Sequence, residues 1–280
     1  MVGIGLVVGL VSSALVWRMM RGTFEAEVFM RSNYRGRRLP TATGLVLIIA
    51  VLGIEAVLAL AEAAGQDPDV ASVTGRRLVV LGGLAFALLG LLDDLAAEGE
   101  SLGFRGHLRA LAGGTLTTGG VKLFGGAAVG IVLAASFEPR SVGRVLADGA
   151  LIALCANLAN LFDRAPGRTA KVGLLSFGVL ALATGLPDQL FGPAFVFGGV
   201  LVLLRGDLRE QLMLGDTGSN VIGATIGIGL LVTTTPTTRS VVLVVVVLLN
   251  LLSEVVSFSS VIGRTPGLRE FDALGRAGRT

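Results

Sequence analysis

Apolar residues in this chain of 280 residues form long runs and do not alternate with polar ones. Runs of this length predict α-helices that cross a membrane, because about 20 apolar residues span the hydrocarbon layer. The predicted spans are roughly residues 3–17, 43–62, 78–92, 121–137, 146–161, 171–186, 189–204, 219–235 and 239–258. Membrane β-strands would show short alternating segments, and the run 241–252 does not alternate. The pattern therefore predicts an all-α, polytopic transmembrane helix bundle of about nine spans.

The composition supports the same class, with 52% hydrophobic residues, 15% charged residues and a mean hydropathy of +0.80. No basic residue precedes the first run and no small-residue cleavage site follows it, so we expect a retained helix and not a signal peptide. Residues 1–280 are expected to form one integral membrane domain, with 259–280 as a C-terminal tail. The single cysteine, Cys155, excludes an intrachain disulfide and predicts a packing role.

Basic residues are distributed unevenly between the predicted loops. If the N-terminus lies outside, eighteen of the 23 basic residues fall in the inner segments. These segments are 18–42, 93–122, 162–171, 205–218 and 259–280. Because cytoplasmic loops carry the excess of Lys and Arg, the N-terminus is predicted outside and the C-terminus in the cytoplasm.

Acidic side chains gather at the predicted inner ends of the spans. Asp216 lies in the stretch Leu-Gly-Asp-Thr-Gly-Ser-Asn at 214–220, at the mouth of an apolar helix, where a carboxylate is costly to desolvate. Asp93 and Asp94 end another span, and adjacent carboxylates repel unless a cation lies beside them. Mg²⁺ is usually bound by one or two carboxylates together with phosphate oxygens. We therefore expect these carboxylates to share one polar site.

A third group of polar residues lies on one predicted helical face. Asn157 and Asn160 are three residues apart, and Asp163 continues the face. We favour a ligand-binding role because Asp163 shares its segment with three basic residues, one of which is Lys171. The alternative is hydrogen bonding between helices, which is common in membrane bundles.

The other candidate features also have structural alternatives. Asp216 could merely cap its helix, and the aspartate pair could be a solvated helix end, although a helix C-terminus disfavours negative charge. Arg37 and Arg38 belong to a cluster of four arginines that could hold phosphate or only touch anionic lipid. In the tail, Arg264 and Arg269 could fold over the site or lie on a solvated helix.

Four short motifs, in this order, resemble those of the polyprenyl-phosphate N-acetylhexosamine-1-phosphate transferases. That superfamily includes phospho-N-acetylmuramoyl-pentapeptide transferase and the bacterial GlcNAc-1-phosphate transferases. The motifs are Leu-Pro-Thr-Ala-Thr-Gly at 39–44, Gly-Leu-Leu-Asp-Asp at 90–94, Asn-x-x-Asn-x-x-Asp at 157–163 and Gly-Asp-Thr-Gly-Ser at 215–219. Each motif is weak alone, whereas four in register with a matching topology are specific. The resemblance covers most of the chain.

The resemblance implies that a lipid phosphate attacks the β-phosphate of a UDP-activated amino sugar, giving a lipid-diphospho-sugar and UMP for cell-envelope glycan synthesis. The implied catalytic residues are Asp93, Asp94, Asp163 and Asp216. Mg²⁺ would be the cofactor, on Asp216, Asp93 and Asp94, while Asp163 would contact the base or activate the lipid phosphate. The implied substrate-binding residues are Arg37, Arg38, Asn157, Asn160, Lys171, Arg264 and Arg269.

The implied partners are a polyprenyl (undecaprenyl) phosphate, a UDP-sugar and the lipid bilayer, with no nucleic acid. The implied location is the bacterial inner membrane, with the active site on the cytoplasmic face. A homodimer is possible, but the sequence does not decide the oligomeric state. Phosphoryl transfer needs mainly positioning and charge neutralisation, and Mg²⁺ and arginine side chains can provide both.

The chain also departs from the family pattern. After Asp163 it reads Arg-Ala-Pro-Gly, which lacks the family's second carboxylate. The family's histidine cluster has no counterpart, because the single histidine is His107, and no tenth helix is predicted. The alternative is therefore a catalytically degenerate member that binds a lipid carrier or acts in cell-envelope assembly or regulation. A transporter is disfavoured, because the polar residues gather at one membrane face and not at the bilayer centre.

Overall fold

The computed structural model describes residues 1–66, 69–96, 113–114, 117–137 and 141–276, so that His107 lies outside the described residues. Nine helices of 16 or more residues lie in these ranges: α1 (Val2–Met20), α2 (Leu45–Ala63), α3 (Val70–Ala96), α5 (Thr118–Ala135), α6 (Val142–Phe162), α7 (Arg168–Ala183), α8 (Phe191–Leu208), α9 (Gly215–Thr233) and α10 (Pro236–Ser253). The shorter elements are η1 (Thr23–Glu25), η2 (Glu27–Phe29), β1 (Met30–Ser32), β2 (Arg38–Pro40), η3 (Asp188–Leu190), α11 (Phe258–Arg264) and α12 (Leu268–Ala273).

Each predicted apolar run coincides with one of the nine long helices, which confirms the all-α class. Six of the described helices are long and apolar enough to cross a membrane, namely α1, α2, α3, α6, α8 and α10. Of the others, α7 has only 16 residues, α5 is a shorter apolar helix, and α9 starts with the polar stretch Gly-Asp-Thr-Gly-Ser-Asn. Nine crossings and the orientation of the termini therefore stay predictions.

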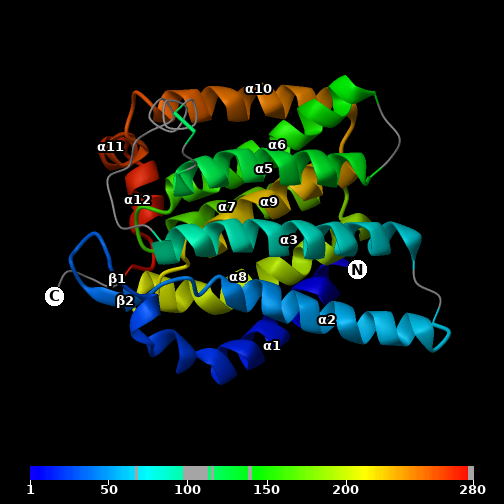
Figure 1. Ribbon diagram of the computed structural model, residues 1–280, viewed down its shortest axis with the longest axis horizontal. Coiled ribbons are helices and arrows are strands. Elements are labelled where there is room, and N and C mark those ends of the chain that lie inside the picture. Colours follow the sequence, from blue (N-terminus) through cyan, green and yellow to red (C-terminus); the bar gives the residue numbers. More distant parts are fainter. Residues whose placement is uncertain (67–68, 97–112, 115–116, 138–140, 277–280) are drawn as a thin grey trace.

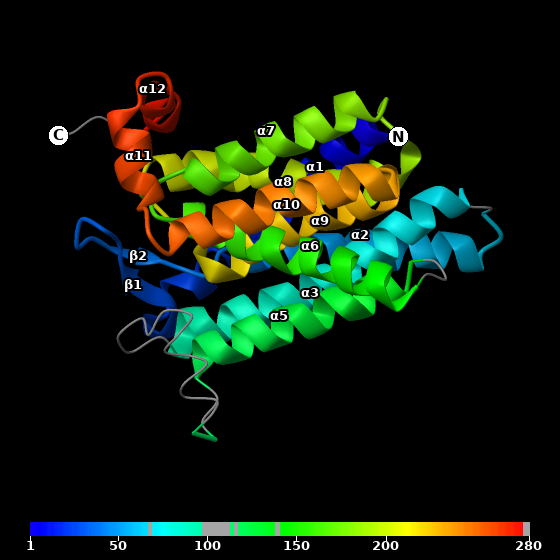
Figure 2. The ribbon, with the colours of Figure 1, turned by 90° about the horizontal axis from the view of Figure 1, so that it is seen from above.

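The long helices run side by side in one bundle (Figure 1). The N-terminus lies at one end, and the β1–β2 hairpin, α11 and α12 lie at the other (Figures 1 and 2). Helix α9 is central, because 16 of its 19 residues are buried and its largest contacts are with α3 and α6. Its first turn, which carries Asp216, faces the hairpin end and is enclosed by neighbouring helices.

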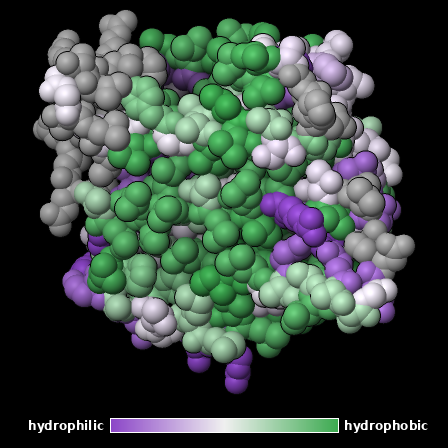
Figure 3. All heavy atoms as spheres, turned by 45° about the vertical axis from the view of Figure 1, so that its right-hand side comes forward, coloured by the Kyte–Doolittle hydropathy of each residue, from purple (hydrophilic) through white to green (hydrophobic). Residues whose placement is uncertain are grey.

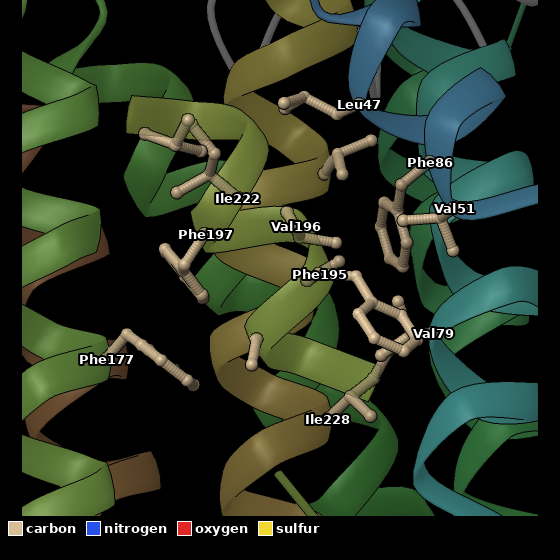
Figure 4. Packing of buried hydrophobic residues seen from close by; sticks show 14 of the residues in the cluster. Leu47, Val51, Val79, Phe86, Phe177, Phe195, Val196, Phe197, Ile222 and Ile228 are labelled. Carbon is tan, nitrogen blue, oxygen red and sulfur yellow. The ribbon is translucent and has the colours of Figure 1, made fainter. Parts of the chain in front are cut away.

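Aliphatic and aromatic side chains fill the space between α8, α9 and their neighbours (Figure 4). Phe195 of α8 lies beside Val79 of α3, while Phe197 faces Phe177 of α7. The rings of Phe177 and Phe197 stack with centroids 4.4 Å apart. In a membrane, such close van der Waals packing is a main source of helix association, because lipid tails are as apolar as the side chains.

The surface of the bundle is apolar over a broad face, with hydrophilic residues mostly at its margins (Figure 3). Large hydrophobic side chains are exposed along α1, α2 and α10, for example Val7, Leu60 and Val244. Soluble proteins rarely expose so extensive an apolar surface. The exposed surface therefore agrees with a bundle surrounded by lipid.

A two-stranded hairpin precedes α2, and the sequence patterns did not predict it. β1 and β2 pair antiparallel, with Arg31 opposite Leu39. Asn33 forms the turn, because its Oδ1 accepts hydrogen bonds from the backbone N–H groups of Arg35 (2.9 Å) and Arg37 (3.0 Å). Local side-chain-to-backbone bonds of this kind favour a turn over a helix.

Ionic groups join helices at the end of the bundle opposite the hairpin. The buried Arg76 of α3 bonds to Glu55 (Nε to Oε2, 2.9 Å) and Glu62 of α2. Arg239 of α10 lies 3.0 Å from the buried carboxylate of Asp148 in α6. Charged groups in apolar surroundings need such partners, so these pairs have a structural role.

Candidate active site

The four motif segments meet around the first turn of α9. Thr43 Oγ1 donates a hydrogen bond to the Met213 carbonyl (2.8 Å), and the Gly44 N–H donates to the Leu214 carbonyl (3.1 Å). A Cβ on Gly44 would overlap the backbone of Gly218. These contacts hold the segment before α2 against the loop that leads into α9.

Helix α3 approaches the same turn from another side. A Cβ on Gly90 would overlap the backbone carbonyl of Asp216, so the approach requires glycine. One turn later, Asp94 Oδ1 accepts a hydrogen bond from the Asp216 N–H (2.9 Å). Asp94 Oδ2 accepts from the N–H (3.0 Å) and the hydroxyl (2.6 Å) of Thr217. Asp94 therefore caps the N-terminus of α9, a role considered above for Asp216.

The carboxylates of Asp93 and Asp216 share one cation. Lys122, near the start of α5, bonds to Asp216 Oδ2, and its Nζ lies 3.6 Å from Asp93 Oδ2. The carboxyl groups of Asp93 and Asp216 also interact with each other. All three side chains are partly buried, so the ammonium offsets a repulsion that water screens only weakly. We call Asp93, Asp216 and Lys122 the carboxylate–lysine centre.

Two amide side chains border this centre. Asn160 Nδ2 donates a hydrogen bond to Asp216 Oδ2 (2.7 Å) and lies 3.4 Å from Asn220 Oδ1. Asp216 and Asn220 are four residues apart in α9 and therefore share a face. Within the described part of the chain, the buried Nδ2 of Asn220 has no hydrogen-bond partner. It can therefore donate to a ligand without giving up a bond.

Asp163 follows the last residue of α6 and is half-buried beside the centre. Burial raises the pKa of Asp163 well above its ordinary value of 3.8, and the carboxylates of Asp207, Asp216 and Asp94 raise it further. Asp207, buried in α8, accepts a hydrogen bond from the Gly167 N–H (3.0 Å). Asp163 therefore lies in the same acidic neighbourhood as the centre and binds its proton more tightly than a free aspartate.

Three predicted substrate-binding residues have other contacts. Asn157 Nδ2 donates a hydrogen bond to Asn250 Oδ1 of α10 (2.7 Å). Asn157 therefore joins two helices, which was the alternative to a ligand-binding role. Arg37 and Arg38 are exposed on the hairpin, where Arg37 lies 3.8 Å from Glu210 and Arg38 pairs with a glutamate of η2. In the contacts that the structure describes, it does not bring these three residues to the carboxylate–lysine centre.

The remaining predicted residues belong to the C-terminal tail or bind it. Lys171 Nζ donates to the carbonyls of Phe271 (2.9 Å) and Asp272 (2.6 Å) at the end of α12. Arg269 pairs with the neighbouring glutamate on the surface, and Arg264 is exposed at the end of α11. Lys171 holds the tail, and no described contact of these three residues involves Asp93 or Asp216.

Two residues of the site were not among the predicted ones. Lys122 is one of two lysines in the chain and stands at the start of an apolar run, which is a readable signal. Asn220 ends the stretch that contains Asp216 but was given no role. Nothing local indicates that Lys122 reaches Asp216, because 94 residues separate them in the chain.

The centre offers two carboxylates to a hard divalent cation. Asp93 and Asp216 both face one position, which the ammonium of Lys122 fills here, whereas Asp94 uses its oxygens on α9. Among the described residues, no three His, Cys, Asp or Glu side chains converge as a metal-ligand group. The donor set therefore fits a Mg²⁺ ion whose coordination is completed by phosphate oxygens and water. The geometry favours Asp93 and Asp216 over Asp94.

An apolar groove of about 830 Å³ lies among α6, α7, α9 and α10. Phe162 and Thr169 line it at the end near Asp163, and Thr233 and Thr238 line it at the opposite end of the bundle. Most of its wall is aliphatic. It can therefore hold a long hydrocarbon chain alongside the central helix.

Together these features define a class: an α-helical bundle with membrane-length helices and a carboxylate–lysine centre at one end of its central helix. No family model matches the chain. The chain is 31% identical over 114 residues to the phospho-N-acetylmuramoyl-pentapeptide-transferase of Moorella thermoacetica. The match covers 39% of this chain and 36% of that protein, so it spans about a third of the relative's length.

Proposed function

We propose that this protein is an integral membrane transferase that moves a sugar-1-phosphate from a UDP-activated amino sugar to a polyprenyl phosphate. The products are a lipid-diphospho-sugar and UMP, for cell-envelope glycan synthesis at the cytoplasmic face of a bacterial membrane. The arrangement of Asp93, Asp216 and Lys122 carries the proposal. The partial similarity to the phospho-N-acetylmuramoyl-pentapeptide-transferase of Moorella thermoacetica supports it.

The centre suits a diphosphate because donors surround its carboxylates. Lys122 supplies an ammonium, and Asn220 supplies amide N–H groups that have no partner among the described residues. In partly buried surroundings such donors stabilise developing phosphate charge more strongly than they would in water. Positioning and charge neutralisation are the main requirements of phosphoryl transfer.

In this proposal Asp93 and Asp216 hold Mg²⁺, which supplies neutralisation of the diphosphate charge when it is bound. Asp94 keeps the first turn of α9 in place and thereby orients Asp216. Asn160 fixes the rotamer of Asp216 through its hydrogen bond to Oδ2.

Asp163 is the proposed proton acceptor. Its carboxylate takes the proton of the lipid phosphate, and a phosphate oxygen then forms a bond to the β-phosphorus of the UDP-sugar. The bond between that phosphorus and the oxygen shared with the α-phosphate breaks, and UMP leaves with the electron pair. The raised pKa of Asp163 suits this role, because it makes the carboxylate a stronger base than that of a free aspartate.

The apolar groove supplies a place for the prenyl chain. Its end at Phe162 and Thr169 is next to the turn that carries Asp163, so a lipid in the groove would have its phosphate near that carboxylate. The groove extends along the bundle toward Thr238, which suits a long apolar tail.

The test is to incubate the purified protein with undecaprenyl phosphate, Mg²⁺ and a panel of UDP-sugars while UMP release is measured. Asp93→Asn and Asp216→Asn are each expected to lower the rate by at least about 100-fold, because each removes a charge that holds the metal and the diphosphate. Asp188→Asn makes the same chemical change in η3, where Asp188 lies 3.5 Å from the N-terminal amine at the other end of the bundle, and it should leave the rate unchanged.

Absence of UMP release with every donor, beside an active control enzyme, would contradict the proposal. Full activity in both the Asp93→Asn and Asp216→Asn variants would place the reaction elsewhere. Purification and thermal unfolding of each variant show whether a lost rate reflects lost chemistry or lost folding.

A second candidate is a non-catalytic protein that binds the lipid carrier. The direct contact of Lys122 with Asp216 favours it, because an ammonium already satisfies the carboxylate that a metal would need. This candidate predicts that undecaprenyl phosphate binds equally well with Mg²⁺ and with EDTA. The transferase predicts binding that Mg²⁺ strengthens.

A further inference from the structure

The C-terminal helices α11 and α12 are attached to the bundle mainly by polar contacts. Helix α11 has no buried residue, and Asp272 is the single buried residue of α12. The two helices lie together at the hairpin end of the bundle, against the start of α7 (Figure 2). A helix pair with so little buried apolar surface depends on its ionic contacts to stay docked.

Asp272 binds a pair of buried cations in the first turn of α7. Arg168 donates to both carboxylate oxygens of Asp272, from Nε (2.8 Å) and from Nη2 (2.9 Å). Lys171 donates to three carbonyls at the end of α12, those of Phe271, Asp272 and Leu274. The exposed fractions of Arg168 and Lys171 are 6% and 9%, so both cations are shielded from water while the tail is docked.

The electrostatics at this position favour an anion. Arg168 and Lys171 stand at the N-terminus of α7, where the helix dipole is also positive. A second carboxylate facing Lys171 is that of Asp207, which accepts a hydrogen bond from the Gly167 N–H. The first turn of α7 therefore needs an anion, and Asp272 supplies it from the tail.

The tail covers the turn between α6 and α7. Arg276 Nε donates to the Pro166 carbonyl (3.0 Å), and its Nη2 donates to Asp272 Oδ1 (2.6 Å). Phe258 stacks on Phe162 with ring centroids 5.1 Å apart, and Phe162 lines the apolar groove near the turn that carries Asp163. Release of the tail would therefore uncover both this turn and the adjacent end of the groove.

We propose that Arg168 and Lys171 form an anion site that Asp272 occupies in cis, and that a phosphate-bearing ligand displaces Asp272 and releases α12. The fork of Arg168 that holds both oxygens of Asp272 has the geometry that also binds two oxygens of a phosphate. A diphosphate or a phosphorylated lipid headgroup carries more charge than one carboxylate and competes for the same donors. Asp272 thus acts as a latch, independently of the proposed transfer reaction.

The experiment is hydrogen exchange on residues 268–274 of the full-length protein in neutral detergent, without Mg²⁺. Asp272→Asn should speed exchange there by at least about tenfold, the change expected from losing charge-assisted hydrogen bonds. Glu270→Gln is the matched control, because Glu270 is an exposed carboxylate of the same helix that pairs with Arg269, and a glutamine can still accept the hydrogen bond that Glu270 accepts from the Gly267 N–H. This control should change the rate by less than about twofold, as for an exposed ion pair.

The ligand is tested with inorganic diphosphate against sodium chloride at equal ionic strength. Diphosphate should speed exchange of 268–274 in the unaltered protein and add nothing in the Asp272→Asn variant, where the latch is already open. A second arm compares bilayer discs of phosphatidylcholine with discs that also contain phosphatidic acid. Acceleration by phosphatidic acid assigns the phosphate to a lipid, and acceleration by diphosphate alone assigns it to a soluble ligand.

Two results would overturn the proposal. Unchanged exchange in Asp272→Asn would show that the ion pairs do not hold α12. Equal acceleration by chloride and diphosphate, with no effect of phosphatidic acid, would mean that salt only screens the latch and no anion site exists. Neither result depends on transferase activity, so failure here is separate from failure of the proposed function.

Discussion

Asp93 and Asp94 are neighbours in the chain, but their carboxylates have different surroundings. Asp94 accepts three hydrogen bonds from the first turn of α9, whereas Asp93 faces Lys122 and Asp216. Adjacent residues near the end of a helix point about 100° apart, so one can fix the position of α9 while the other faces the cation. Substitution of Asp94 should therefore affect stability more than substitution of Asp93.

Asp94→Ala is expected to lower the free energy of unfolding by about 2 kcal/mol, because two backbone N–H groups of α9 and the Thr217 hydroxyl lose their acceptor. Asp93→Ala should change it by less than about 1 kcal/mol, since it removes a partly exposed ion pair and also a like charge. Thermal unfolding of both variants in the same detergent makes the comparison. Equal losses of stability would contradict the division of roles.

Asp163 predicts a pH dependence of the proposed reaction. Burial and three neighbouring carboxylates raise its pKa, so it stays protonated at pH values where a free aspartate, with its ordinary pKa of 3.8, is ionised. The proton acceptor is the ionised form, so UMP release should fall as the pH drops through this raised pKa.

Asp163→Asn removes that titration, so the variant should be slower and its rate should lose the acid-side decline. The measurement is the rate of UMP release at saturating substrate over a range of pH. An unchanged decline in the variant would assign it to another group.

At the scale of elements, α9 is held by the close approach of α2 and α3. Gly44 and Gly90 remove the side chains that would separate these helices from the turn with Asp216. Close helix approach through small residues is typical of membrane bundles. The site thus depends on backbone contacts as much as on its charged groups.

Gly90→Ala is expected to destabilise the protein and slow UMP release, because the new Cβ would overlap the Asp216 carbonyl and push α3 away from α9. Gly53→Ala is the matched control, since Gly53 lies within α2 and has open space around the position of a Cβ. Alanine there should be neutral or stabilising by up to about 1 kcal/mol, as its helix propensity exceeds that of glycine. Thermal unfolding of both variants checks the contrast, and similar behaviour would contradict the proposed close approach.

At the scale of the whole molecule, the groups proposed to bind ligands are concentrated at one end. The carboxylate–lysine centre, the hairpin and the latch all lie there, and the N-terminus lies at the other end. This polarity matches the uneven distribution of basic residues along the chain. An enzyme with soluble nucleotide substrates would need this end in the cytoplasm.

The predicted orientation can be tested with a membrane-impermeant maleimide in a Cys155→Ala background. Tyr34→Cys at the exposed hairpin should react only after the membrane is made permeable, and Val142→Cys at the exposed start of α6 should react in intact cells. The expectation follows from the excess of basic residues in the hairpin-side segments. Labelling of Tyr34→Cys in intact cells would reverse the orientation.

The sequence by itself determined the helical membrane class, the positions of the long helices and the ends at which carboxylates stand. These properties are local, because a run of apolar residues and its polar boundary can be read along the chain. It also identified Asp93, Asp94, Asn160, Asp163 and Asp216 as residues of one neighbourhood, through motifs and a common membrane side.

Only the tertiary structure decided which partner each polar side chain has. Lys122 meets Asp216, Asp94 caps α9, Asn157 turns to α10, and Lys171 binds the tail. Each of these contacts joins residues from different helices. The packing of apolar faces sets how helices are rotated and how closely they approach, and neither quantity is encoded in the residues around any single site.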